Sequence, residues 1–298
     1  MRYTETTLKT WIAPLSQTEE QRVENTVKMI KDAVLSYSKL YGCTIEVFAQ
    51  GSYANNTNVR HDSDVDICVM CKSTFFPNYV DGMIDKDYGH SEGSISYADY
   101  KKYVIDALKL KFGSSAVTVG NKSIKIKENS YHVNADVVPA FQYRDYKIIS
   151  SKAENKFVEG IKYIATDGTV VINYPKIHID NGKQKNNQTN MRYKRLVRIM
   201  KRIKNNMQEE GKVDSTKITS FLIECLVWNV PNSTINSAIT WENMVRDAIA
   251  YLWNAIKEER HKEWGEVSEK LYLFHSSRKW TAKETQDFLY DMYNYLQY

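Results

Sequence analysis

The stretch GSYANNTNVRHDSDVDICVM, residues 51–70, joins a Gly-Ser turn to two aspartates spaced two residues apart. Asp64 and Asp66 alternate with apolar residues as in a β-strand, so both carboxylates are predicted to emerge on one face of it. Like charges at this spacing repel each other unless a cation binds between them. Ligands that are all oxygen favour Mg²⁺ or Mn²⁺ over zinc. The stretch therefore predicts a divalent metal site on a strand.

A second predicted strand, within residues 131–141 (YHVNADVVPAF), supplies a third acid. Asp136 is the lone carboxylate of this stretch, and alternation places His132 and Asn134 on its own face. Two metal ions held by such carboxylates stabilise both the attacking and the leaving oxygen in phosphoryl or nucleotidyl transfer. The sequence thus predicts three residues as catalytic groups and as ligands of two Mg²⁺ (or Mn²⁺) ions: Asp64, Asp66 and Asp136.

These motifs resemble the polymerase-β-like nucleotidyltransferase superfamily, whose signature is Gly-Ser, a helical turn, Asp-x-Asp and a third Asp on a later strand. The chain as a whole is similar to the bacterial cGAS/DncV-like nucleotidyltransferases (CD-NTases). This resemblance runs from about Thr18 to the C-terminus and is thin after Asn232. It rests on four stretches: VFAQGSYANNTNVR (47–60), INYPKIHIDNG (172–182), RLVRIMKRIKNN (195–206) and ITSFLIECLVWNVP (218–231).

The resemblance also implies how nucleotides are held. Gln50, Gly51 and Ser52 match the turn that cradles the triphosphate, while Lys201 and Ser220 match a lysine and a serine that contact phosphates. For Lys201 the alternative is the solvated face of a basic helix, since residues 189–206 carry seven Lys or Arg and no acid. For Ser220 the alternative is a plain helix N-cap. His178 and Asn181 lie in the expected crossing between lobes and are candidates for the border of the nucleotide pocket.

The expected fold class is α+β. A polymerase-β-like lobe with an N-terminal helix and a mixed sheet is expected over residues 1–175, and a helical lobe that completes the nucleotide pocket over 176–298, with the active site in the cleft between them. Periodicity predicts helices at 18–40, 96–112, 189–208, 215–229, 241–260 and 281–296, and strands at 44–49, 64–70, 116–120, 123–127, 131–139, 147–150 and 170–173, with 72–95 a loop and 174–190 a polar, strand-free crossing.

Composition excludes several other classes of protein. The 298 residues carry a net charge of +5, which suits a polyanionic partner, and show no signal peptide or apolar run long enough for a membrane span, so a cytoplasmic protein without membrane contact is expected. Four cysteines are too few for a disulfide framework. Cys68 and Cys71 have the spacing of half a zinc site, but on a strand they point to opposite faces, which predicts half-buried structural thiols.

By resemblance, the chain would join nucleoside triphosphates into a cyclic di- or trinucleotide second messenger with release of pyrophosphate, in antiphage (CBASS-type) defence. A downstream effector would read the product, and the activator stays open between a nucleic acid and a regulatory protein. One alternative is a nucleotidyltransferase that modifies RNA, a protein or a small molecule. Another is a non-catalytic nucleic-acid-binding module, although a pure binder gains nothing from acids that face phosphates.

Overall fold

The computed structural model describes residues 2–14, 16–59, 64–147 and 156–298. The chain divides into two compact units, one of Ser16–Ala54 and Asp62–Lys176, the other of Met1–Leu15, Asn55–His61 and Ile177–Tyr298. We call the first the sheet unit and the second the helical unit, and describe each by itself. No helix in the described ranges is both long and apolar enough to cross a membrane.

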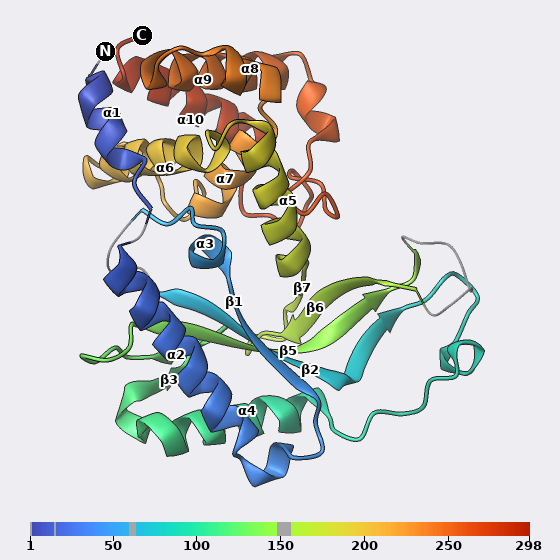
Figure 1. Ribbon diagram of the computed structural model, residues 1–298. Helices are drawn as coiled ribbons and strands as arrows, with labels where there is room; N and C mark the ends of the chain where they lie inside the picture. The colour runs from blue at the N-terminus through green and yellow to red at the C-terminus, as the bar shows by residue number, and fades with distance from the viewer. Residues whose placement is uncertain (1, 15, 60–63, 148–155) are drawn as a thin grey trace. The chain divides into compact units, whose positions relative to one another are not determined.

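The sheet unit is built on a mixed sheet that has seven strands over the described residues, in the order β1-β2-β5-β4-β3, with β6 on β5 and β7 on β6 (Figure 1). The two central strands, β2 and β5, run parallel, and every other pairing is antiparallel. The strands are β1 (Ile45–Gln50), β2 (Val65–Asn78), β3 (Val117–Val119), β4 (Ile124–Ile126), β5 (Ala135–Asp145), β6 (Val158–Ile164) and β7 (Val170–Asn173).

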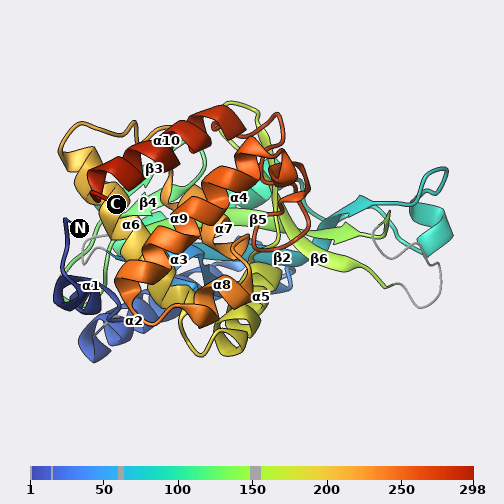
Figure 2. The same ribbon diagram turned by 90° about the horizontal axis from the view of Figure 1, so that it is seen from above.

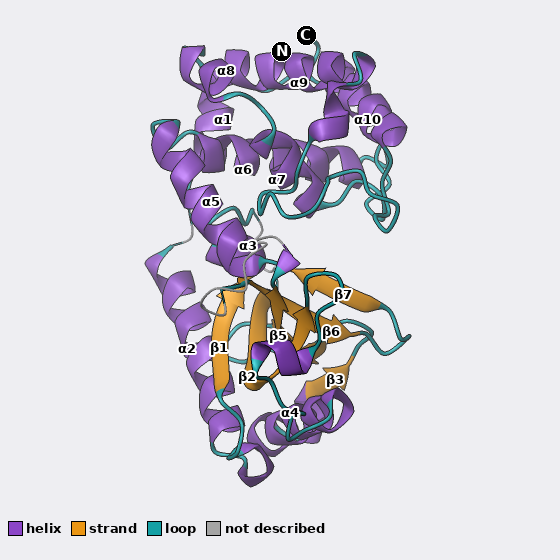
Figure 3. Ribbon diagram, turned by 90° about the vertical axis from the view of Figure 1, so that its right-hand side faces the viewer, coloured by secondary structure: helices purple, strands orange, loops and turns teal. Residues whose placement is uncertain are grey.

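Two long helices of the sheet unit, α2 (Gln17–Leu35) and α4 (Tyr97–Phe112), pack against each other and against the sheet (Figure 3). Helix α2 opens with a capping box in which the side chains and backbones of Ser16 and Glu19 satisfy each other. It ends at Leu35, before the predicted residue 40, and the chain then forms a short 3-10 turn. The one-turn helix α3 (Gly51–Ala54) follows β1 directly.

The helical unit has one apolar core, to which α1, α6, α7, α9 and α10 contribute. Helix α6 contributes an apolar stripe to this core, because Leu196, Ile199, Met200 and Ile203 are all fully buried. Helix α10, the last of this unit, begins with a capping box formed by Thr281 and Glu284. The helices, which Figure 2 shows from above, are α1 (Glu5–Trp11), α5 (Pro175–Gln188), α6 (Tyr193–Glu209), α7 (Ser220–Trp228), α8 (Asn232–Ser237), α9 (Trp241–Lys257) and α10 (Ala282–Tyr295).

Strand β5 does not end near Pro139 as predicted but continues to Asp145. On one edge β5 pairs first with β4, through residues 135–137, and then with β6, through residues 141–145. Pro139 falls between these two partners, where a missing N–H breaks no ladder bond on that edge. The proline therefore marks a change of partner within the strand.

Other predictions differ from the structure in extent or type. Strand β2 runs eight residues past the predicted end at Met70, into the region expected to be a loop. The crossing at 174–190 contains helix α5, and β6 and α1 were not predicted. The strand predicted at 147–150 lies largely outside the described residues. Cys68 and Cys71 are free thiols as expected, but both are fully buried rather than half-buried, because β2 is covered on both faces.

The main division between the two units, between Lys176 and Ile177, lies one residue from the predicted one, but two earlier segments of the chain depart from the prediction. Helix α1 packs against α6 and α9, so the first residues of the chain belong to the helical unit. Residues 55–61 belong there too, and the chain returns to the sheet unit at Asp62, a residue outside the described ranges.

Candidate active site

Two of the predicted carboxylates lie on neighbouring strands in the middle of the sheet. Asp66 of β2 stands opposite Asp136 of β5 in the parallel register, so the two side chains share one face. The Ser123 hydroxyl, at the start of β4, donates a hydrogen bond of 2.9 Å to Asp136 Oδ1. His132 and Asn134 both precede β5. His132 is buried with its ring packed against that of Phe112, so its predicted grouping with Asp136 is wrong.

Asp64 lies immediately before β2, and its carboxylate faces a lysine. Lys125 Nζ is 3.9 Å from Asp64 Oδ2, and both side chains are partly exposed to solvent. Burial raises the pKa of Asp64, the charges of Asp136 and Glu128 raise it further, and Lys125 opposes them. Lys125 stands on β4 directly opposite Asp136. The three aspartates therefore lie at one end of the central strands, which we call the carboxylate edge, and Lys125 of β4 lies near Asp64 and opposite Asp136.

This edge has the donor chemistry of a divalent cation site but not its final geometry. Carboxylate oxygens are the ligands that Mg²⁺ and Mn²⁺ prefer. The pKa of Asp64 is raised first by burial and then by the nearby charge of Asp136. Among the described residues, however, no three His, Cys, Asp or Glu side chains are gathered closely enough to hold a metal ion. The three carboxylates fit a divalent cation by their chemistry. To bind one, the Asp64 carboxylate would exchange its contact with Lys125 for a contact with the cation.

The Gly-Ser turn packs directly against the Asp-x-Asp strand. Gln50 ends β1 opposite Asp66, and Gly51 then turns the chain with a φ of 67°. A Cβ added at Gly51 would overlap the Asp66 carboxylate, so only glycine permits both the turn and this close approach. Ser52 is half-buried in the single turn of α3. The residues between the two motifs connect the end of β1 to the start of β2.

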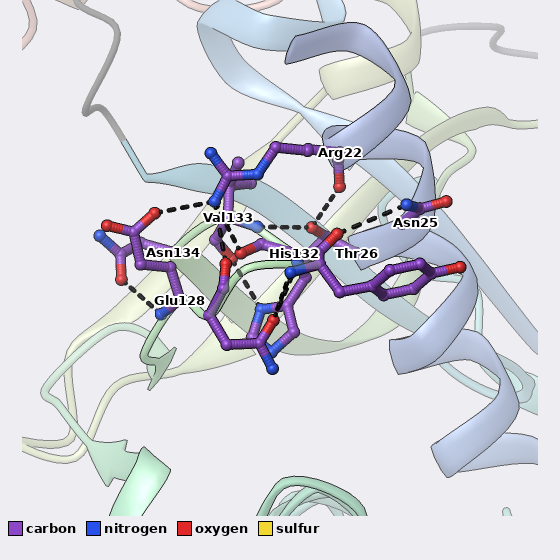
Figure 4. A network of polar contacts seen from close by, with 9 residues as sticks. Arg22, Asn25, Thr26, Glu128, His132, Val133 and Asn134 are labelled. Atoms are coloured by element: carbon purple, nitrogen blue, oxygen red, sulfur yellow. Dashed lines mark hydrogen bonds and ion pairs between the residues drawn. The ribbon is translucent and has the colours of Figure 1, made fainter. Parts of the chain in front are cut away.

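A network of polar contacts holds the loop that leads into β5 (Figure 4). Arg22 of α2 donates to the Glu128 carboxylate at 3.1 Å and to the carbonyl oxygen of His132 at 3.2 Å. Thr26 accepts from the Val133 N–H at 3.2 Å. The Asn134 carbonyl in turn accepts from the N–H of Val65 at 2.9 Å, the first residue of β2. Helix α2 therefore anchors the starts of both strands that carry the aspartates.

In the helical unit, Lys201 lies in a buried ion pair. Lys201 Nζ is 2.6 Å from Glu224 Oε2 and 3.1 Å from Thr57 Oγ1, and Lys201 is only 2% exposed. His178 Nε2 lies 3.0 Å from the other oxygen of Glu224. Burial alone would raise the pKa of Glu224, but the Lys201 ammonium and the His178 ring outweigh it and hold that pKa well below its ordinary value. Lys201 is therefore not on a solvated face of α6, because its ammonium group is buried and paired with Glu224.

Ser220 and Asn181 have different surroundings. Ser220 is the exposed first residue of α7, whereas the Thr219 side chain caps that helix by accepting from the Leu222 N–H. The alternative that Ser220 is the N-cap is therefore wrong. The Asn181 side chain donates to the carbonyl oxygen of Val267 at 2.8 Å.

Three residues whose side chains contact predicted site residues were not identified from the sequence: Ser123, Lys125 and Glu224. Ser123 and Lys125 alternate with buried isoleucines in SIKIK, so a polar strand face was visible. The residue that this polar face contacts could not be predicted, because only the pairing of β4 with β5 places the face beside Asp136. Glu224 is the one acid in the apolar run FLIECLVW, and such a buried acid indicates a paired cation.

Comparisons with known proteins agree with this architecture. A family model for the cGAS/DncV-like nucleotidyltransferase C-terminal helical domain matches residues 180–297, and a nucleotidyltransferase domain model matches residues 27–117. A protein of Cecembia lonarensis named cyclic dipyrimidine nucleotide synthase CdnE is 46% identical over 100% of this chain and 99% of its own length. A protein of the same name from Legionella pneumophila is 39% identical over 98% of both chains.

Solved structures give the same result. The Rhodothermus marinus CdnE c-UMP-AMP synthase with Apcpp and Upnpp superposes with a TM-score of 0.88 at 29% identity, over 99% of this chain and 97% of that one. The Elizabethkingia meningoseptica CdnE cyclic dinucleotide synthase with GTP and Apcpp gives 0.82 at 30% identity, over 99% and 100%. Over its whole length the chain therefore belongs to the cGAS/DncV-like nucleotidyltransferases, with a mixed-sheet nucleotidyltransferase fold followed by a C-terminal helical domain.

Proposed function

We propose that this chain joins two nucleoside triphosphates into a cyclic dinucleotide, that pyrimidine nucleotides are among its substrates, and that pyrophosphate is released at each step. The observation that carries the proposal is the full-length identity of 46% and 39% with two proteins named cyclic dipyrimidine nucleotide synthases. Relatives named for GMP-AMP or dipurine products are less similar, at 34% and 32%. The choice of pyrimidines therefore follows the more similar relatives.

The proposed chemistry takes place at the carboxylate edge, where Asp64, Asp66 and Asp136 lie. An acceptor hydroxyl oxygen attacks the α-phosphorus of a triphosphate, the bond from that phosphorus to the pyrophosphate oxygen breaks, and the hydroxyl proton passes to Asp136. The three aspartates would hold Mg²⁺ or Mn²⁺, which neutralises the phosphate charge and favours loss of that proton. The second step repeats the first with the linear dinucleotide, whose own hydroxyl attacks its own α-phosphorus.

We assign phosphate binding to Gln50, Gly51 and Ser52 of the Gly-Ser turn, and also to Lys201 and Ser220. The Ser52 hydroxyl is half-buried beside Gly51, which itself lies against Asp66. Ser220 is exposed. Contact between Lys201 and a phosphate requires its pair with Glu224 to open, so Lys201 is the weakest member of this set.

We further propose that the product is a signal in antiphage (CBASS-type) defence and that a separate effector reads it, as the family implies. A regulatory protein or a nucleic acid would control the synthesis.

The product assay separates this proposal from its alternatives. Purified protein is incubated with α-labelled nucleotides and Mg²⁺ or Mn²⁺, without any acceptor. A cyclic product carries no terminal phosphate and is expected to resist phosphatase, with a mass that identifies its bases. Label that appears only on added RNA, protein or a small molecule would replace the proposal with a different transferase. Nucleic-acid binding without any product would indicate a binding module.

The carboxylates are tested one at a time with Asp64→Asn, Asp66→Asn and Asp136→Asn. Each variant is expected to fold and to lose product formation by about 10²-fold or more, because each removes charge that acts on the transferred phosphoryl group. Circular dichroism supplies the folding control. Product made by Asp66→Asn at the rate of the wild type, with the same dependence on metal, would contradict the assignment.

The phosphate grip predicts a different kinetic signature. Ser52→Ala is expected to raise the KM for nucleotide by about tenfold and to change kcat less, because it removes a hydrogen bond to a charged group. Lys201→Ala is compared with it under the same conditions. If both variants keep the wild-type KM, the triphosphate binds elsewhere.

A further inference from the structure

Two polar side chains at β4, those of Ser123 and Lys125, lie at the carboxylate edge. The proposed reaction uses neither of them. Residues 123–127 alternate, so Ile124 and Ile126 are buried while Ser123 and Lys125 lie on the face of Asp136. Each of the two contacts a different aspartate, as described above. Their contacts differ in kind: one is a hydrogen bond, the other a loose ion pair.

The Ser123 contact restricts the orientation of Asp136. Its hydroxyl occupies Oδ1 at 2.9 Å and leaves Oδ2 for another partner. A carboxylate held by one hydrogen bond loses rotational freedom, so binding a further group through its second oxygen costs less entropy. Ser123 is partly buried, which favours a single geometry for this bond.

The Lys125 contact compensates charge near Asp64. The separation of 3.9 Å is at the outer limit of an ion pair, and the lysine side chain is 59% exposed. Such a pair is weak and is readily exchanged. Two other carboxylates act on Asp64, those of Asp136 and Glu128, and Glu128 is itself paired with Arg22. Among the described residues, Lys125 is thus the positively charged side chain that pairs with the Asp64 carboxylate.

We infer that β4 prepares the carboxylate edge for a divalent cation: Ser123 is a positioning residue that fixes Asp136, and Lys125 is a counterion that occupies Asp64 until the divalent cation replaces it. The inference rests on the metal site of the proposed function. It gives the two residues opposite effects on cation binding. Losing Ser123 removes a pre-oriented ligand, whereas losing Lys125 removes a competitor.

The test is a titration of the full chain with Mn²⁺ alone, in which electron paramagnetic resonance measures free Mn²⁺. Ser123→Ala is expected to weaken binding by about tenfold, the usual cost of losing a group that orients a ligand, and Ser123→Thr to restore it. Lys125→Gln is expected to tighten binding about threefold, because one exposed charge is removed, and Lys125→Arg to behave like the wild type. Lys127→Gln, an exposed lysine two residues further along, is the matched control and should leave binding unchanged.

A second readout uses thermal unfolding in EDTA. Without divalent cations Lys125→Gln is expected to unfold at a lower temperature than Lys127→Gln, because the repulsion between Asp64 and Asp136 is no longer compensated, and saturating Mn²⁺ should close the gap. Equal Mn²⁺ affinity in the wild type, Ser123→Ala and Lys125→Gln would overturn the inference, provided that Asp66→Asn loses the binding. If Asp66→Asn binds Mn²⁺ as the wild type does, the metal site of the proposed function is wrong and the inference falls with it.

Discussion

A missing side chain lets the Gly-Ser turn lie against the Asp66 carboxylate. Gly51→Ala is expected to cost about 1–2 kcal/mol of stability, since an L-residue at a positive φ is strained. It should also displace Asp66 and so reduce product formation by about 10²-fold, because misplacement of a reacting group by 1 Å has that effect. Chemical denaturation and the product assay measure the two effects.

Gly168→Ala is the matched control for that prediction. Gly168 has a φ of 84° in the turn before β7, and an added Cβ would meet nothing within 4 Å. It shares the backbone strain but not the overlap with a carboxylate. It should lose similar stability and keep its activity. Equal losses of activity in both variants would mean that backbone strain, not Asp66, explains the effect.

At this scale the local sequence pattern predicted the shared face of the aspartates but not the groups around them. The spacing of Asp64 and Asp66 is local, and the alternation of the strand determines their faces. The contacts of Ser123, Lys125 and Lys201 link residues 13, 61 and 23 positions apart. Such contacts depend on strand register and helix packing, which no local pattern encodes. The local motifs therefore locate the three aspartates but not the groups that contact them.

Among the elements, helix α5 shows why a polar segment can be misread. The part of α5 that is buried consists of Gly182, Lys185 and Asn186, so no apolar stripe indicates a helix. Lys185 Nζ instead donates to the carbonyl oxygen of Val230 at 2.8 Å and to Asn232 Oδ1 at 2.9 Å. Helix α1 was missed because it has only seven residues, and β6 because Gly160 lies inside it, where a glycine weakens the pattern of a strand. By contrast, α6 and α10 show clear apolar periodicity or a cap, and both were predicted.

The burial of Lys185 predicts a dependence of stability on pH. Burial lowers the pKa of Lys185 to about 8 from its ordinary value of 10.5. Between these values the unfolded chain binds the proton and the folded chain does not, so this lysine's contribution to stability increases as pH rises through that window. Below about pH 8 both states are protonated and the contribution stays constant. The increase is at most about 3 kcal/mol.

The measurement compares the wild type with Lys185→Met by urea denaturation at pH 7 and pH 9.5. The difference between the two proteins cancels the titration of tyrosines and cysteines. The wild type is expected to gain stability relative to Lys185→Met at the higher pH. A difference independent of pH would show that Lys185 titrates at its ordinary value.

Helix α1 makes a second prediction at this scale. Leu8 is fully buried in the core of the helical unit, where α1 packs against α6 and α9. Leu8→Ala is expected to lower the free energy of unfolding by about 2–5 kcal/mol, because it leaves a cavity in a packed core. Lys9→Ala, on the exposed side of the same helix, is the control and should change stability by less than about 0.5 kcal/mol. Equal effects would mean that α1 is not packed as described.

At the scale of the whole molecule, the two units share the chain in an interleaved order. The segments Met1–Leu15 and Asn55–His61 belong to the helical unit although most of that unit follows residue 176. They supply partners for its buried cations. Arg198 donates to the carbonyl oxygen of Ile12 at 2.6 Å and to that of Asn56, and Lys201 donates to Thr57. A cut at residue 175 removes all three partners at once.

We therefore expect the fragment 176–298 not to unfold cooperatively on its own. Buried charges that lose their partners cost several kcal/mol each, and removal of α1 also exposes the apolar surface around Leu8, which together exceed the stability of a typical small domain. Thermal unfolding followed by circular dichroism tests this. The matched fragment carries residues 2–14 joined to 176–298 by a flexible linker, restores Leu8 and Ile12, and should recover part of the transition. Cooperative unfolding of 176–298 alone, at the temperature of the joined fragment, would show that the helical unit does not need these segments.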